Sequence, residues 1–164
     1  MPPTTTVQKV KNIGDIIAAD GSIDETIKER TDKWYGIVNE IVSILEEIPL
    51  GPFRVTVGFE LRETMLLNGI LFNSELWYKI KEEHIQKLSS VDEYLLRSIL
   101  GAPSKTPIEA LYLQTGCLPK KYIIKKRRLM YLHHILWRPK KELIRKFYEA
   151  QKTKLSKGEF KLIL

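Results

Sequence analysis

Cationic side chains recur at helical spacing in the last third of this 164-residue chain. Lys121, Lys125 and Arg128 are separated by four and then three residues, which places them on one face of a helix. Like charges at this spacing repel one another in an isolated helix. Phosphates lying along the helix would reverse this effect, because their binding releases counterions. The spacing therefore predicts contact with a phosphate backbone.

Further cations widen this basic face on both sides. The predicted nucleic-acid-binding residues are Lys121, Lys125, Lys126, Arg127, Arg128, Arg138, Lys140, Lys141 and Arg145. Trp137 lies next to this set and is the one tryptophan that we expect near a nucleic acid. Contacts of this kind follow the backbone and do not read the base sequence. The alternative interpretation is a solvated helix face whose charge only keeps the protein in solution.

The charge of the chain is divided sharply between its two parts. Residues 120–164 hold fifteen lysines and arginines against three glutamates, a net charge of +12, whereas residues 1–119 carry −5 and the whole chain +7. This division predicts a polyanionic partner, with nucleic acid as the first choice. An acidic protein or an anionic membrane surface is the alternative partner.

Other reactive side chains are not spaced for catalysis or for metal binding. The adjacent His133 and His134 point about 100° apart on a helix, so they cannot share one ion. His84 stands beside two glutamates and is expected at the surface. Cys117 is the only cysteine, which excludes an internal disulfide and a cysteine-based zinc site. We therefore expect no catalytic residue, no metal and no cofactor, and a reducing intracellular compartment.

Hydrophobic periodicity predicts a mainly α protein, a bundle of five to six helices after a short N-terminal β segment. Residues 7–17 form the extended stretch, which closes at an Asp20-Gly21 turn. Ser22 and Glu25 form a capping box that opens a long amphipathic helix to about Ile48. In the following apolar stretch, residues 55–57 favour a strand and residues 61–76 favour a buried helix.

The second half of the chain predicts four more helices. An amphipathic helix from Ile85 to Ile99 ends at Gly101. Thr106 is the expected N-cap of a short helix that ends at Thr115, before Gly116. A third helix starts at Pro119 and breaks at Arg138-Pro139. The last, residues 140–151, is expected to turn four side chains inward, namely Leu143, Ile144, Phe147 and Tyr148.

Five segments of the chain, in order and with compatible spacing, resemble the region after the polymerase palm of non-LTR (LINE-type) retrotransposon reverse transcriptases. They are NIGDIIAADGS at 12–22, GILFNSELW at 69–77, VDEYLLRSILGAPSKTP at 91–107, LYLQTGCLP at 111–119 and RRLMYLHHIL at 127–136. The resemblance covers roughly residues 10–150, nearly the whole chain.

The resemblance implies a division into four parts. These are an N-terminal β remnant at 1–21, a thumb-like helical part at 22–101, a connector-like basic helical part at 102–151 and a basic tail at 152–164. Ile13 and Gly14 match a Leu-Gly pair at the family's primer grip, where Asn12 replaces the usual aromatic residue. The cations from Lys125 to Arg128 match the basic helix of the connector.

The resemblance also implies a function without chemistry of its own. The family's metal-binding aspartates, in an aromatic-x-Asp-Asp turn, precede the region that this chain resembles. We therefore expect a fragment of an RNA-directed DNA polymerase that holds the backbone of an RNA–DNA or DNA duplex, in the nucleus or the cytoplasm, with no membrane partner. The alternative is a helical protein-interaction module, or a translated remnant without function.

Replacing both Lys125 and Arg128 by alanine is expected to weaken duplex binding about equally for all sequences, because both residues would contact phosphates. The slope of log affinity against log salt should flatten by up to about two units, which filter binding at several salt concentrations measures. Affinity that does not depend on salt would contradict the nucleic-acid interpretation.

Overall fold

The computed structural model describes residues 9–12, 15–18, 22–77 and 80–156. Its elements are β1 (Lys9–Asn12), β2 (Asp15–Ala18), α1 (Asp24–Glu46), α2 (Pro52–Leu61), the π-helix η1 (Arg62–Leu67), α3 (Asn68–Ile70), the 3₁₀ turn η2 (Ser74–Leu76), α4 (Glu82–Leu100), α5 (Ile108–Thr115), α6 (Lys120–Trp137) and α7 (Leu143–Ser156). The mainly α bundle with a short N-terminal β segment is thus confirmed.

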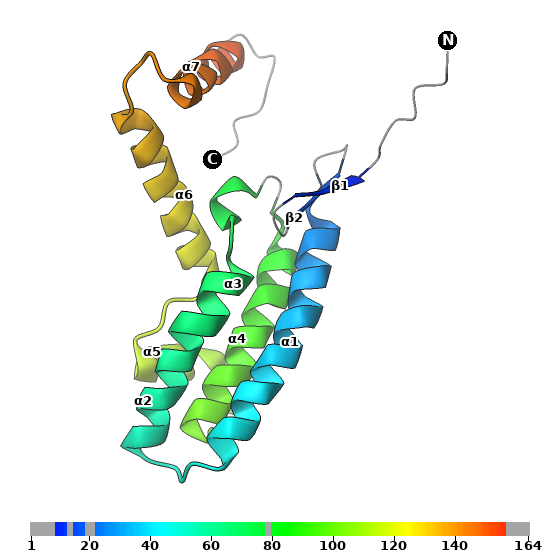
Figure 1. Ribbon diagram of the computed structural model, residues 1–164. Coiled ribbons are helices and arrows are strands. Elements are labelled where there is room, and N and C mark those ends of the chain that lie inside the picture. Colours follow the sequence, from blue (N-terminus) through cyan, green and yellow to red (C-terminus); the bar gives the residue numbers. More distant parts are fainter. Residues whose placement is uncertain (1–8, 13–14, 19–21, 78–79, 157–164) are drawn as a thin grey trace, which may run out of the picture.

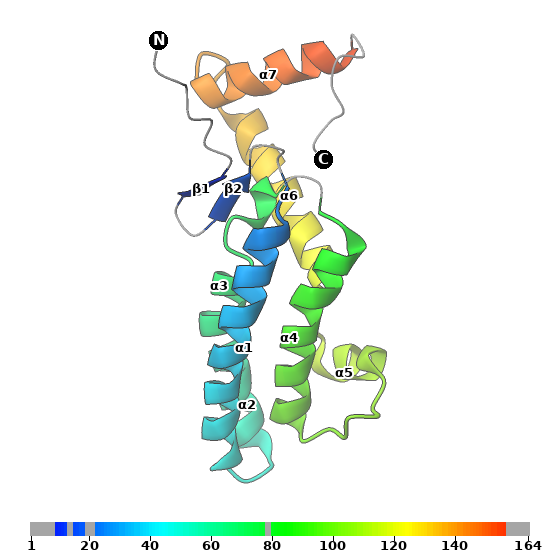
Figure 2. The ribbon, with the colours of Figure 1, turned by 90° about the vertical axis from the view of Figure 1, so that its right-hand side faces the viewer.

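Three helical rods lie side by side in the bundle (Figure 1). They are α1, the continuous run of α2, η1 and α3, and α4. Their shared core consists of aliphatic side chains with essentially no exposure, among them Val38, Leu45, Leu66, Leu88 and Leu95. The helix α6 rises from the side of this bundle. The last helix, α7, lies across the C-terminal end of α6 (Figure 2).

The N-terminal strands form an antiparallel hairpin in which Lys9 pairs with Ala18 and Asn12 with Asp15. The predicted extended stretch is therefore confirmed at residues 9–12 and 15–17, whereas its other residues and its Asp20-Gly21 turn lie outside the described residues. Asp15 ties the hairpin to the bundle, because its carboxylate accepts a hydrogen bond of 2.6 Å from Arg30 and one of 3.0 Å from Asn73.

The long first helix is confirmed, and it begins one residue later than predicted. Helix α1 begins at Asp24 and has Ile23 as N-cap, with no side-chain capping bond. Asp24 and Glu25 instead place two negative charges in the first turn, where they interact favourably with the helix dipole.

The predicted strand at residues 55–57 is also wrong, because these residues belong to α2. Pro52 lies in the first turn of this helix, where its fixed φ favours helix formation and its missing N–H leaves no bond unmade. Burial against α1 and α4 then outweighs the strand preference of the two valines. The helix predicted at 61–76 ends early, at Ile70, and Asn73 adopts a left-handed conformation with φ of 56° in the turn that follows.

Helices α4 and α5 end where the sequence predicts, at Gly101 and Gly116, both with positive φ. The start of α5 differs from the prediction. Pro107 is its N-cap, and Thr106 provides no capping bond.

Helix α6 breaks at Arg138 as predicted, but α7 begins three residues late and continues to Ser156. Two of the side chains predicted to face inward are exposed, Leu143 at 70% and Phe147 at 61%. Since α7 packs mainly on α6 at the end of the molecule, only a narrow strip of its apolar face is covered. Ile144 and Tyr148 lie on this strip and line a cavity of about 300 Å³ between α7, α6 and η2.

Gly69 is required by the packing of α3 on α1. A Cβ at this position would overlap the indole ring of Trp34. We expect Gly69→Ala to lower the unfolding free energy by roughly 1–3 kcal/mol, because the ring has to move. Urea denaturation followed by circular dichroism measures this change.

Gly36 is the matched control for this prediction, since it lies in α1 with no atom within 4 Å of the added Cβ. Gly36→Ala should stabilise the protein by up to about 1 kcal/mol through helix propensity alone. Equal effects of the two substitutions would contradict the packing role of Gly69.

Candidate nucleic-acid interface

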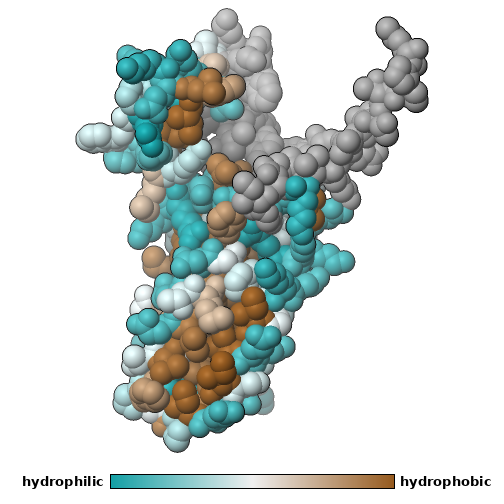
Figure 3. Space-filling view, viewed as in Figure 1, coloured by the Kyte–Doolittle hydropathy of each residue, from teal (hydrophilic) through white to brown (hydrophobic). Residues whose placement is uncertain are grey.

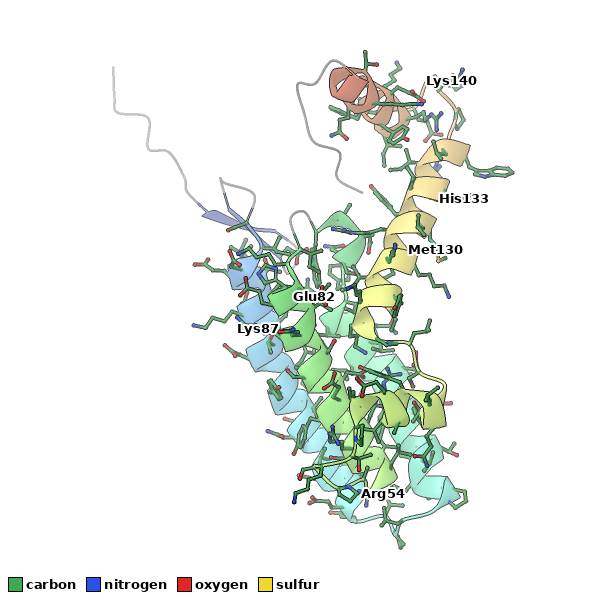
Figure 4. All side chains as sticks on the ribbon, turned by 180° about the vertical axis from the view of Figure 1, so that it is seen from behind. Arg54, Glu82, Lys87, Met130, His133 and Lys140 are labelled. Atoms are coloured by element: carbon green, nitrogen blue, oxygen red, sulfur yellow. The ribbon has the colours of Figure 1, made fainter. Side chains whose placement is uncertain are left out.

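Helix α6 carries the central part of the predicted basic face. It begins after Pro119, whose φ of −55° and ψ of 146° end the preceding loop, and it contains six lysines and arginines but no acidic residue. Figure 4 shows that the helix starts against the bundle and extends beyond it, with its outer side open.

Four lysines of the predicted set are exposed and make no ion pair with any described residue. They are Lys125, Lys126, Lys140 and Lys141. Lys121 is also exposed, but its Nζ lies 3.3 Å from a carboxylate oxygen of Glu82 on α4. The accessible charge therefore begins one turn into α6 and continues past its C-terminus.

Arg127 and Arg128 have a different role from the one predicted. Nη1 of Arg127 donates a 2.5 Å hydrogen bond to the carbonyl of Leu71, and Arg128 donates to the carbonyl of Trp77. Burial lowers the pKa of the Arg128 guanidinium. Both side chains hold α6 against the segment between α3 and α4, and the single stripe through Lys121, Lys125 and Arg128 does not form.

Arg138 and Arg145 lie at the junction of α6 and α7. Arg138 is 3.7 Å from Glu142 and contacts the ring of His134. Arg145 lies over the ring of Tyr148 and is 2.7 Å from Glu149, with little of its side chain exposed. Arg145 is thus part of the packing, whereas Arg138 remains accessible. The predicted primer-grip pair, Ile13 and Gly14, lies outside the described residues.

A buried charge cluster fixes where α6 starts, and the sequence analysis did not predict it. Asp92 of α4 accepts two hydrogen bonds from Arg62, of 2.7 and 2.9 Å, and its Oδ2 is 2.5 Å from Nζ of Lys120. All three side chains are almost fully buried. Arg62 also reaches the exposed Glu63 at 2.8 Å.

The three charges stabilise one another against the cost of burial. Burial alone would raise the pKa of Asp92, but Lys120 and Arg62 more than offset this, and the pKa of the carboxyl is lowered. Burial lowers the pKa of the Lys120 ammonium to about 8, although Asp92 favours its charged form. Removing Asp92 would leave the two buried cations without compensation.

The sequence does contain a pattern that indicates this cluster, because its charged residues stand at helical spacing from apolar core residues. Asp92 lies four residues after Leu88 and three before Leu95, and Lys120 lies four before Ile124, all of them core positions. Charged residues in phase with a core face indicate a buried ion pair. His84 shows the same effect, since it is buried rather than at the surface and its Nε2 is 2.6 Å from Asp24.

The three tryptophans differ in their exposure. Trp77 is buried, Trp34 is partly buried against the core, and Trp137 is 79% exposed beside His133. Among the described residues, no group of histidine, cysteine, aspartate and glutamate side chains is placed to hold a metal ion. Nor is any described helix both long enough and apolar enough to cross a membrane.

The chain matches no protein-family model, and no curated protein or solved structure matches it. The position and accessibility of the side chains themselves are therefore what indicates a function.

Lys120 makes the stability of the fold depend on pH. The unfolded chain keeps the lysine proton up to its ordinary pKa of 10.5, whereas the folded protein releases it near 8. Because the unfolded state binds more protons between these values, we expect the unfolding free energy to rise from pH 8 to 10, by at most about 3 kcal/mol. Urea denaturation at several pH values measures this rise.

Lys120→Met is the control, since it removes the titrating group and leaves Asp92 paired with Arg62. Its stability should stay level over the same range. The scan should end at pH 10, because burial raises the pKa of Tyr112 and its contribution changes above that pH. Parallel curves for the two proteins would contradict the role of Lys120.

Proposed function

We propose that this chain binds the sugar–phosphate backbone of a duplex nucleic acid, as the thumb and connector of a non-LTR retrotransposon reverse transcriptase, and that it contributes no catalytic group. The proposal depends on one observation. Lys125, Lys126, Lys140 and Lys141 form an accessible basic surface on α6 and just beyond it, with no ion pair to a described residue.

The dimensions of this surface fit a duplex. From Lys125 to its C-terminus, α6 extends by about 18 Å, given the rise of an α-helix. A duplex presents a negative charge about every 1.7 Å along its axis, so several phosphates lie within reach of the four lysines. Contacts of this type depend on charge and would be similar for any base sequence.

The order of the elements also supports the proposal. The resemblance implies a helical thumb followed by a basic connector, and the three-rod bundle of α1 to α4 is followed by α5 and the basic α6. In this interpretation Arg127 and Arg128 position α6 on the thumb, and the lysines contact the nucleic acid.

The lysines can be tested without disturbing the packing. We expect Lys125→Ala/Lys126→Ala to weaken binding to an RNA–DNA duplex and to reduce the slope of log affinity against log salt by about two units. Fluorescence anisotropy between about 50 and 200 mM salt, with several duplex sequences, measures both quantities. This pair replaces the pair that contains Arg128, whose loss would also loosen α6.

Lys87→Ala/Lys105→Ala is the matched control, because it removes two exposed lysines from the acidic part of the chain. Figure 4 shows Lys87 on α4, away from α6. The control should bind like the wild-type protein. An equal loss in both double variants, or wild-type affinity that is insensitive to salt, would exclude the proposed interface.

A further inference from the structure

We infer that this chain binds a second copy of itself head to tail, through two exposed apolar surfaces that carry opposite charge. One surface lies on α6 and the other on α1 and α2. The inference does not depend on nucleic-acid binding, because it concerns the protein alone.

The first surface is the outer face of α6, the side turned away from the bundle. Figure 4 shows Met130 and His133 projecting from it. Counted from Tyr122, its side chains follow at four, seven, eight, eleven and fifteen residues, which is helical spacing. They are Tyr122, Lys126, Leu129, Met130, His133 and Trp137. Its apolar members are more than half exposed, with Met130 at 61% and Trp137 at 79%.

The fold leaves this face without a partner among the described residues. The opposite side of α6 packs on the bundle through the buried Lys120 and Ile124, and its buried Ile135 lies near η2 and α7. An exposed apolar stripe of about 22 Å, from Tyr122 to Trp137, is unusual on a helix that has already buried its other side. Lys125 and Lys126 border the stripe with positive charge.

The second surface is a patch formed by side chains of α1 and α2. Figure 3 shows it as a broad hydrophobic area on the lower half of the molecule. Ile44 is 51% exposed and Phe53 69% exposed, and Ile37, Val57 and Leu61 are partly buried beside them.

Acidic residues surround this patch. Glu40 on α1, Glu47 just after its C-terminus and Glu60 on α2 are exposed at its border. From Trp34 to Leu61 the only cation is Arg54, which is buried and donates hydrogen bonds to the carbonyls of Ile48 and Ser98. Lys33, one turn before Ile37 on α1, is exposed at one end of the patch, so the border of the apolar surface is predominantly negative.

The α6 face of one copy has a charge opposite to that of the α1–α2 patch of another copy, whereas two identical surfaces would carry the same charge. Two α6 faces would bring Lys125 and Lys126 of both copies together, and two α1–α2 patches would bring their glutamates together. Apolar surface with a basic border on one copy instead matches apolar surface with an acidic border on the next. Such a heterologous contact adds further copies until a ring closes or a filament grows.

Sedimentation of the nucleic-acid-free protein tests this inference. We expect the average mass of the wild-type protein to rise between about 1 and 100 μM. Two variants each remove one apolar surface, Leu129→Gln/Met130→Gln on α6 and Ile44→Gln/Phe53→Gln on the patch. Each should weaken self-association at least about tenfold, since exposed residues at the centre of an interface contribute most of its affinity.

An equimolar mixture of the two variants distinguishes head-to-tail contact from other arrangements. Each variant retains the surface that the other lacks, so the mixture should form a 1:1 dimer and nothing larger. Leu113→Gln/Leu118→Gln, which changes two other exposed leucines, is the control and should associate like the wild-type protein. Circular dichroism checks that all variants are folded.

Three results would overturn the inference. One is a wild-type protein that stays monomeric at about 100 μM, which would assign the surfaces to another partner. Another is a dimer that only the α6 variant disrupts, which would indicate symmetric pairing of α6. The third is a mixture of variants that does not associate.

Discussion

Asp92 lies between two cations that come from distant parts of the chain, and the position of α6 depends on this buried contact. Arg62 approaches from η1 and Lys120 from the first turn of α6. Because an unpaired charge in the core costs several kcal/mol, α6 has to leave the bundle where Lys120 reaches Asp92. The direction of every lysine on α6 follows from this constraint.

The arginines of α6 complete this attachment. The carbonyls of Leu71 and Trp77 lie in the irregular segment around η2, and that of Leu71 also accepts a hydrogen bond of 3.1 Å from the Ser74 N–H. Arg127 and Arg128 donate to these carbonyls, so two cations that the spacing assigns to phosphate satisfy the protein's own backbone. Their neighbours Lys125 and Lys126, on the other side of the helix, remain accessible. Attachment and proposed binding are thus divided between two sides of one helix.

Charge polarity connects the two proposals made for this chain. The acidic part forms the bundle, and the basic part stands apart from it on α6 and α7 (Figure 1). A duplex and a second copy would both use Lys125 and Lys126, the first through phosphates and the second through the glutamates around the α1–α2 patch. Binding of nucleic acid would therefore compete with self-association.

The sequence by itself determined the helical class, most helix ends and the excess of positive charge in the last third. Glycine, proline and periodic apolar residues act locally, so Gly101, Gly116 and Pro139 mark boundaries without reference to the rest of the chain. Only the tertiary structure decided that residues 55–57 are helical and that Arg127, Arg128 and Lys120 face inward. These outcomes depend on partners far away in the sequence, such as Asp92, 28 residues before Lys120, and Trp77, 51 residues before Arg128. Spacing along one helix gives the relative direction of its side chains, but which side meets the core is decided by packing and by the pairing of buried charges.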